Sequence, residues 1–221
     1  MRSERTKQMA TLAMLSALAF IVMMFIRIPV VLFLSYEPKD VIIAMAGFIY
    51  GPMSALIMSA ILALLEMVTV SDTGPFGAIM NFISSATFAC TAAIIYRRWR
   101  TLPGAAVGLF SGIVITVPIM LLWNYLIVPL YVLHITRADV IPMLIPIFLP
   151  FNLLKYGLSA ALTMLLYKSL RLALQKSNLL PQSHDTNTSI TGKKATVGVV
   201  VVSAFVVLTC VMFILAWRGI I

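Results

Sequence analysis

The stretch PFNLLKYGLSAALTMLLY, residues 150–167, decides how the chain is read. It approaches the roughly 20 apolar residues that a helix needs to cross a bilayer, yet it contains Asn152 and Lys155. A lysine at the centre of a membrane helix costs roughly 2.5–3.5 kcal/mol. Helical spacing puts Asn152 and Lys155 on one face, where an amide and an ammonium can hold a polar heterocycle with carbonyl and imide groups. The alternative is a lysine near a helix end that reaches the lipid headgroups.

The composition of the whole chain is that of an all-α integral membrane protein with several spans. Of its 221 residues, 62% are hydrophobic and only 10% are charged. Backbone groups inside a bilayer must pair within their own segment, which favours helices over open strands. The net charge of +9 does not indicate nucleic acid as a partner, because the basic residues lie in short segments between apolar runs. Cys90 and Cys210 lie inside apolar runs and are interpreted as small buried hydrophobes rather than a disulfide.

Hydropathy and turn signals predict a six-helix membrane domain that binds the substrate over residues 1–176. Gly51-Pro52 should form a tight turn between two shortened helices, and the segments 27–40 and 71–75 should be loops. The segment 128–150 carries four prolines and should be a loop with an irregular helix start. The predicted helices are Met9–Ile26, Val41–Tyr50, Met53–Val68, Phe76–Tyr96, Ala105–Leu126 and Pro146–Leu170.

Two further segments follow the six-helix domain. Residues 177–196 are a polar linker rich in Ser, Thr and Asn, and residues 197–217 are a valine-rich run that we expect to be an additional C-terminal transmembrane helix. Threading the helices from a cytoplasmic N-terminus satisfies the positive-inside rule. The basic residues then inside are Arg2, Arg5, Lys7, Arg97, Arg98, Arg100, Lys168, Arg171, Lys176, Lys193 and Lys194, and those outside are Arg27, Lys39, Arg137 and Arg218.

In this threading the polar residues of the spans share the outer part of the membrane. The residues concerned are Tyr36 to Asp40, Glu66, Asn81, Asn124, Asn152 and Lys155. A pocket open to the outside, with few polar groups on apolar walls, accounts for them together. Aromatic residues at the same level are available to stack on a flat ligand, or form an ordinary interfacial belt. They are Tyr36, Phe76, Trp123, Tyr125 and Tyr156.

A stripe of small residues marks the first helix. Ala10, Ala13 and Ala17 lie along it, and Ala13-xxx-Ala17 has the spacing that lets another helix approach closely. Packing within the bundle is the alternative explanation of this stripe.

The chemistry of an enzyme is missing from the sequence. There is no Walker A loop, and no group of His, Cys and carboxylate residues has metal-ligand spacing. His134 and His184 are isolated in predicted loops, so neither supports a catalytic set with a serine. A binding subunit that takes its energy from partners therefore fits better than a membrane enzyme acting on a lipid or peptide. A structural subunit without a ligand is a third possibility, against which the shared depth of the polar residues argues.

Four motifs resemble the substrate-binding S components of energy-coupling factor (ECF) vitamin transporters, most closely the riboflavin-specific type. They are YEPKDV at 36–41, AGFIYGP at 46–52, SDTG at 71–74 followed by MNFI at 80–83, and NLLK at 152–155. The GFIYGP turn is the most specific of them. The first loop, SYEPKD at 35–40, departs from the Asp-Phe-Ser-Asp-like loop that many riboflavin members carry.

This resemblance implies a multi-pass protein of the cell membrane that captures a vitamin at the outer face, under the first loop acting as a lid. It also implies a transmembrane coupling subunit, which docks on Ala10, Ala13 and Ala17, and two ATP-binding subunits. Riboflavin would be cargo rather than a cofactor, and the expected substrate-binding residues are Tyr36, Glu37, Asn81, Asn124, Asn152 and Lys155. An S component for another vitamin or a nucleobase-like substrate is the alternative.

Overall fold

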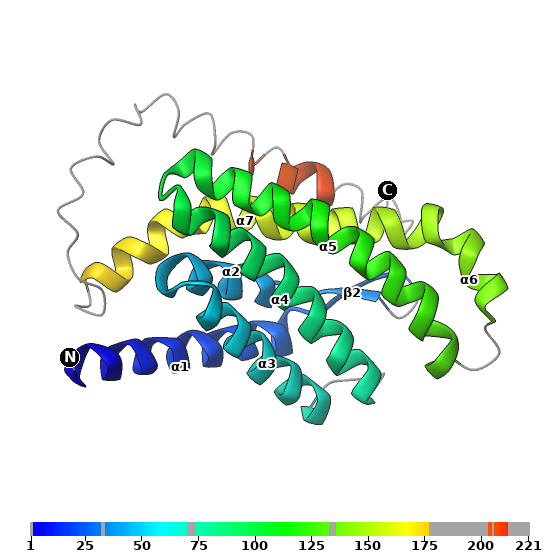
Figure 1. Ribbon diagram of the computed structural model, residues 1–221, viewed down its shortest axis with the longest axis horizontal. Coiled ribbons are helices and arrows are strands. Elements are labelled where there is room, and N and C mark those ends of the chain that lie inside the picture. Colours follow the sequence, from blue (N-terminus) through cyan, green and yellow to red (C-terminus); the bar gives the residue numbers. More distant parts are fainter. Residues whose placement is uncertain are drawn as a thin grey trace.

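The computed structural model describes residues 2–31, 34–69, 74–132, 136–176, 203–204 and 206–211. Its elements up to residue 176 are mainly helical, as predicted, with one small hairpin (Figure 1). They are α1 (Arg2–Phe25), β1 (Ile28–Val31), β2 (Leu34–Tyr36), α2 (Lys39–Tyr50), α3 (Pro52–Thr69), α4 (Gly74–Arg98), α5 (Leu102–Tyr131), α6 (Arg137–Met143), the π-helical η1 (Leu144–Phe148) and α7 (Leu149–Lys176).

Five helical stretches of the described chain are long and apolar enough to cross a membrane. They are Arg5–Phe25, Pro52–Thr69, Gly74–Arg98, Leu102–Leu130 and Arg137–Tyr167. The helix α2 has 12 residues, a length of roughly 18 Å at 1.5 Å per residue, which is too short to span alone. The chain is therefore a multi-pass helical membrane protein.

The first predicted loop contains a β-hairpin that the sequence analysis missed. Strands β1 and β2 pair antiparallel, with Ile28 opposite Tyr36 and Val31 opposite Leu34. The β-branched residues of β1 favour extended backbone, and the ladder satisfies groups that an open loop would leave unpaired. The loop is also shorter than predicted, because α2 begins at Lys39 rather than at Val41. Lys39 and Asp40 consequently lie in the first turn of a helix.

The predicted turn between two short helices is confirmed. α2 ends at Tyr50, α3 begins at Pro52, and Gly51 between them has a φ of +97°. That value lies in the region that glycine adopts without steric cost. The GFIYGP motif thus reverses the chain sharply and sets α2 against α3.

The segment after the fifth predicted span is more helical than expected. α5 continues to Tyr131 with Pro129 inside it, and the described residues from Arg137 onward are helical again. Asp139 Oδ2 accepts the Thr136 backbone N–H at 2.9 Å and so caps α6. The predicted irregular start of the sixth helix is confirmed by η1, whose widened turn contains Pro146, a residue without an N–H to donate.

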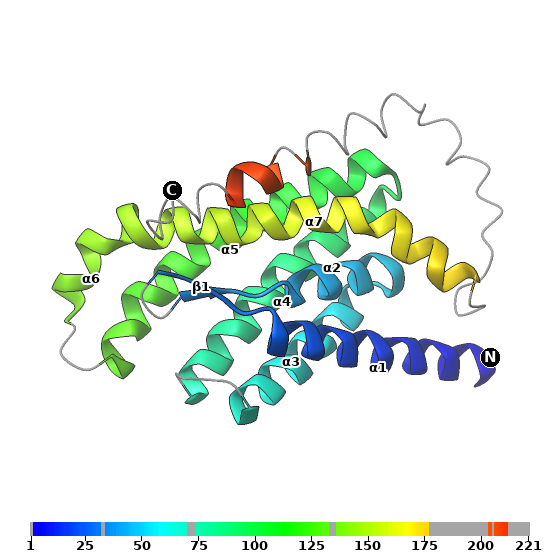
Figure 2. The ribbon, with the colours of Figure 1, turned by 180° about the vertical axis from the view of Figure 1, so that it is seen from behind.

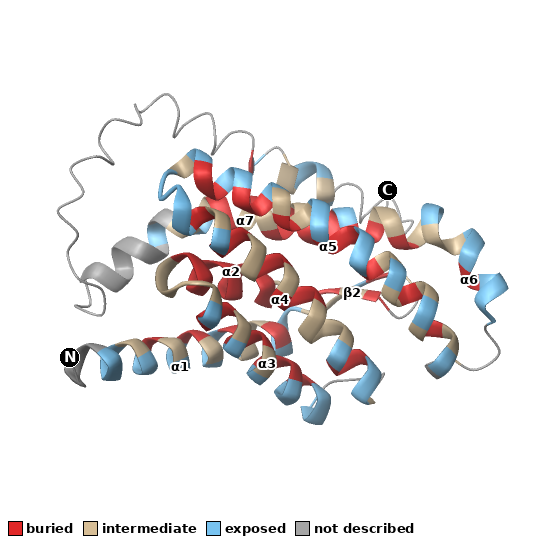
Figure 3. Ribbon diagram, in the orientation of Figure 1, coloured by how far each residue is buried: buried red, intermediate tan, exposed pale blue. Residues whose placement is uncertain are grey.

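Helices α4 and α5 pack closely along one another. A Cβ atom at Gly108 of α5 would lie 2.6 Å from the Ala92 carbonyl oxygen of α4, so only glycine fits there. The outward faces of the bundle carry exposed apolar side chains such as Phe110, as a lipid-facing surface requires (Figure 3).

The buried residues form two clusters. The larger one joins α1, α2, α3, α4, α5 and α7, and the smaller one attaches the hairpin to α5, α6, η1 and α7. The N-terminus of α1 and the C-terminal end of α7 lie at one end of the molecule, and α6 lies at the other (Figures 1 and 2). The hairpin lies nearer the α6 end. Residues 71–73 of the predicted second loop and the linker 177–196 fall outside the described residues.

Candidate ligand-binding site

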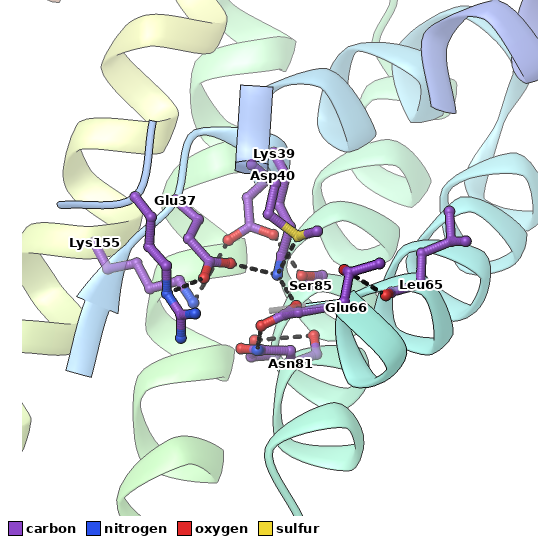
Figure 4. A network of polar contacts seen from close by, with 12 residues as sticks. Glu37, Lys39, Asp40, Leu65, Glu66, Asn81, Ser85 and Lys155 are labelled. Carbon is purple, nitrogen blue, oxygen red and sulfur yellow. Dashed lines mark hydrogen bonds and ion pairs between the residues drawn. The ribbon is translucent and has the colours of Figure 1, made fainter. Parts of the chain in front are cut away.

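A buried lysine ties the hairpin to the third helix. The Lys39 side chain is 1% exposed, and its ammonium lies 2.5 Å from Glu37 Oε2 and also contacts Glu66 Oε2 (Figure 4). An ion in such surroundings is tolerated only when it is paired. Lys39 meets that condition with two carboxylates, one preceding α2 and one on α3.

The ion network extends to both sides of this lysine. Glu37 also pairs with Arg27, whose Nε lies 3.3 Å from Glu37 Oε1, and Glu66 Oε1 accepts a hydrogen bond from Asn81 Nδ2 at 2.5 Å. Burial by itself raises the pKa of the Glu37 carboxyl, but the attraction of Lys39, Lys155 and Arg27 and the Lys39 hydrogen bond lower it more, so that its pKa falls below the ordinary value. Glu37 is therefore a charged residue that fixes the end of the hairpin to Lys39.

A second branch of the site is built on Asp40. Its Oδ1 accepts a hydrogen bond from Ser85 Oγ of α4, and its Oδ2 lies 3.8 Å from Lys155 Nζ of α7 (Figure 4). Asp40 is fully buried and Lys155 is 5% exposed. The first turn of α2 thus meets α3, α4 and α7 at one level of the bundle.

Several buried polar atoms next to this network have no hydrogen-bond partner among the described residues. They are the hydroxyls of Tyr36 and Tyr156 and Asp40 Oδ2, and Asn124 Oδ1 on α5 is a further buried atom without a partner. Folded proteins pair nearly all of their buried polar groups, so such a set needs an explanation. A polar ligand that brings its own donors and acceptors would satisfy these atoms.

Aromatic surfaces border the same region. The Tyr156 ring, fully buried, packs against Phe88 with 5.2 Å between ring centroids. The Tyr36 ring is 2% exposed, and its hydroxyl lies beside Ser159 of α7 without hydrogen-bond geometry. Burial raises the pKa of Tyr36, so this residue of β2 stays a neutral hydroxyl. Phe76, by contrast, is 38% exposed.

The structure brings four of the six predicted substrate-binding residues into one region. Glu37, Asn81 and Lys155 belong to the ion network, and Tyr36 directly precedes Glu37 in the chain. The two remaining asparagines are buried but do not share those ion pairs. Asn152 Nδ2 donates to the Phe148 carbonyl of the preceding turn at 2.7 Å, and Asn124 is 1% exposed on α5.

The sequence analysis placed Lys39 and Asp40 at the depth of the pocket but left them, like Ser85, out of the predicted substrate-binding residues. The two charged residues directly precede an apolar run, where side chains commonly reach the headgroup region. Ser85 carried no signal, because serine is an ordinary packing residue in membrane helices. The usable signal was that YEPKD combines three charges directly before Val41–Tyr50, the shorter of the two shortened helices that the sequence predicts.

The alanine stripe of the first helix lies on the surface. Ala10, Ala13 and Ala17 are all exposed on α1, whereas Leu15 and Ala19 on its other face are buried. The stripe is therefore not used in packing within the described part of the bundle. Its small side chains leave a flat face that another helix can approach.

The chemistry that this arrangement offers is binding. Within the described residues, no group of three His, Cys, Asp or Glu side chains is placed to hold a metal ion. The groups that converge are ammonium, carboxylate, amide and hydroxyl side chains on fixed helices, a set of donors and acceptors suited to a polar molecule.

Comparisons with known proteins point to one family. Residues 7–167 match the family described as the ECF transporter, substrate-specific component. The riboflavin transporter RibU of Staphylococcus aureus (strain TCH60) is 30% identical over 175 residues, which are 76% of this chain and 92% of that protein. The riboflavin transporter FmnP of Bacillus subtilis (strain 168) is 28% identical over 163 residues, 68% of this chain and 85% of that protein.

A solved structure agrees with the family match. It is described as the S component of a bacterial ECF transporter, and it aligns with a TM-score of 0.65 and 28% identity over 77% of this chain and 99% of its own. The resemblance noted from the four sequence motifs is therefore confirmed. The chain belongs to the substrate-specific components of ECF transporters and is a non-enzymatic, membrane-embedded transporter subunit.

Proposed function

We propose that this chain is a high-affinity riboflavin-binding S component. It captures the vitamin at the outer face of the cell membrane and delivers it with a transmembrane coupling subunit and two ATP-binding subunits. The observation that carries the proposal is the set of buried polar atoms without a hydrogen-bond partner at Tyr36, Asp40 and Tyr156, beside Lys155. Support also comes from the two riboflavin transporters that match at 30% and 28% identity.

The groups at the site complement an isoalloxazine ring. Its pyrimidine edge carries two carbonyls and an imide N–H, which suit the Lys155 ammonium as donor and Asp40 Oδ2 as acceptor. Asn152 would release its bond to Phe148 to join that edge, and Asn124 would add a further hydrogen bond from α5. Tyr36 and Glu37 cover the ligand as parts of the lid. Asn81 acts through Glu66, since its amide bonds that carboxylate.

The topology that we propose places the N-terminus in the cytoplasm. α1, α2, α3, α4, α5 and the α6–α7 stretch would then be the six helices of the S-component bundle, with residues 197–217 as an additional transmembrane helix. The basic ends of α1 and α4 lie inside in this orientation, in agreement with the positive-inside rule. The exposed face of Ala10, Ala13 and Ala17 is the docking surface for the coupling subunit.

The direct test is the visible absorption spectrum of protein purified in detergent from cells grown in rich medium. We expect a flavin band near one equivalent, or quenching of riboflavin fluorescence when the vitamin is added. A colourless preparation that also leaves the fluorescence unchanged would reject riboflavin. A panel of other vitamins and nucleobases would then identify the substrate, because the SYEPKD lid departs from the usual riboflavin pattern.

A further inference from the structure

The short C-terminal segment that the structure describes has one inward face. Residues 203–204 and 206–211 are helical. Ser203 is buried at 6% exposure and Val207 and Cys210 are half-buried, whereas Leu208 and Val211 are 63% and 43% exposed. Positions 203, 207 and 210 have the i, i+4, i+7 spacing of one helix face. The apolar residues of the other face suit contact with lipid.

The inward face packs against the buried cluster that includes the hairpin. Val207 and Cys210 lie against the smaller buried cluster, which contains Val30 and Leu34 of the hairpin together with residues of α5, α6, η1 and α7. Tyr36, the last residue of β2, is a member of the same cluster. The segment runs beside α7 in both ribbon views (Figures 1 and 2).

This contact lies beyond the part of the chain that the family shares. The family match ends at residue 167. The solved S component is covered over 99% of its length by 77% of this chain, so part of this chain has no counterpart there. Residues 203–211 therefore add a packing partner to a lid that is otherwise formed by two short strands.

A two-stranded hairpin alone is marginally stable and depends on what it packs against. The described strands have four and three residues, and the lid must open to admit a ligand and close to retain it. Apolar side chains placed behind the hairpin favour the closed position, because opening would expose the surface that they cover.

We propose that residues 203–211 brace the lid from the α7 side, with Val207 and Cys210 holding the hairpin and Tyr36 closed over the site. The brace slows opening of the lid and hence release of the bound vitamin. The slower release of the vitamin rests on the proposed riboflavin function, whereas the bracing of the hairpin concerns the protein without ligand.

Hydrogen exchange of the ligand-free protein tests the brace directly. Val207→Ala/Cys210→Ala removes the inward face, and Leu208→Ala/Val211→Ala is the matched control that removes at least as much apolar volume from the outward face. We expect amide exchange of residues 28–36 to become about five- to tenfold faster in the first variant only, given the apolar surface deleted. Equal exchange in both variants would overturn the proposal.

A cross-link tests the placement independently. In a Cys90→Ala background with a protease site inserted in the linker 177–196, a bis-maleimide reagent with an arm about as long as a tyrosine side chain should join Tyr36→Cys to Cys210 and retain the cleaved C-terminal fragment on a denaturing gel. The control moves the second thiol outward with Cys210→Ser/Leu208→Cys. Loss of the fragment in both proteins, or its retention in both, would contradict the placement.

Release kinetics then connect the brace to transport. Riboflavin should dissociate about five- to tenfold faster from Val207→Ala/Cys210→Ala than from the outward-face control, while association rates and ligand-free melting temperatures stay equal. Faster lid exchange without faster release would overturn the link to retention. Absence of riboflavin binding in the wild type would reject the proposed function alone, because exchange and cross-linking still decide the brace.

Discussion

Asp40 and Lys155 face each other across the candidate site, with 3.8 Å between Asp40 Oδ2 and Lys155 Nζ. That separation is longer than the roughly 2.7–2.9 Å of a charge-assisted hydrogen bond. Asp40 is held by Ser85 through its other oxygen, so the carboxylate has a fixed direction. A ligand that contacts both groups gains an acceptor and a donor whose positions are already set, which lowers the ordering cost of binding.

Removing the ammonium of Lys155 should weaken vitamin binding without unfolding the protein. We expect Lys155→Ala to reduce riboflavin affinity by about 1.5–3 kcal/mol, the range for a hydrogen bond to a charged group. Fluorescence quenching measures the dissociation constant. Arg100→Ala, an exposed basic residue beyond the end of α4, is the control and should leave it unchanged. A wild-type dissociation constant for Lys155→Ala would remove this residue from the site.

The ion pairs of Lys39 should matter for stability more than those of any surface lysine. Lys39→Met leaves Glu66 as a buried carboxylate without its cation, and breaking a buried pair costs about 3–5 kcal/mol. Melting in detergent should show a large loss, and adding Glu66→Gln should restore part of it because the orphaned charge is removed. Equal melting of Lys39→Met and wild type would mean that the network contributes nothing to folding.

The apolar pattern predicted the helices, because turn signals such as Gly51-Pro52 and long hydrophobic runs are local properties of the chain. The hairpin was not predicted, since its two strands are short, with seven residues in all. They depend on pairing with each other and on packing with α5 and α7. Lys155 and Asn81 were recognised because a polar group is costly at their depth. Asp40 was placed at the same depth but not among the substrate-binding residues, because its burial depends on where α2 begins and on Ser85, 45 residues away.

Acid should loosen the lid through Glu37. Burial raises the pKa of Glu37, but Lys39, Lys155 and Arg27 together outweigh that effect, so in the folded protein it lies below the ordinary value of 4.5. A lowered pKa stabilises the folded state above the unfolded pKa, and this stabilisation is lost as the pH falls through the folded pKa. The contribution should therefore be constant above about pH 5 and decline below the 4.5 of the free side chain.

Melting temperatures of the ligand-free protein between pH 7 and pH 3.5 measure this decline. Glu37→Gln is the control: it should be less stable at pH 7, and its curve should converge with that of the wild type in acid. Parallel curves over the whole range would show that other carboxylates cause the acid sensitivity.

A bulky side chain in the alanine stripe should abolish transport while leaving vitamin binding intact. Ala13 is exposed on α1, so Ala13→Trp is accommodated in the S component but prevents close approach of a partner helix. Riboflavin binding should stay at the wild-type level, while vitamin uptake by whole cells is abolished. Ile57→Trp, at an exposed position of α3, adds similar bulk elsewhere and should leave uptake intact. Equal loss of binding and uptake in Ala13→Trp would mean that the substitution only disturbs folding.

Two glycines of long helices should respond oppositely to a single methyl group. A Cβ at Gly108 would lie 2.6 Å from the Ala92 carbonyl oxygen, a backbone atom that cannot rotate away, whereas a Cβ at Gly157 of α7 would have no neighbour within 4 Å. Gly108→Ala must therefore push α5 away from α4, at a cost of about 1–3 kcal/mol. Gly157→Ala should be neutral or stabilise α7 by up to about 1 kcal/mol, because alanine restricts the unfolded chain.

The same pair connects helix packing to the site. α4 carries Asn81 and Ser85, and α5 carries Asn124, so a separation of the two helices changes the spacing of groups that we expect to contact the ligand. Gly108→Ala should accordingly lower both the melting temperature and riboflavin affinity, whereas Gly157→Ala, only two positions from Lys155, should lower neither. A loss of affinity in Gly157→Ala with normal binding by Gly108→Ala would place the ligand against α7 alone and remove α5 from the site.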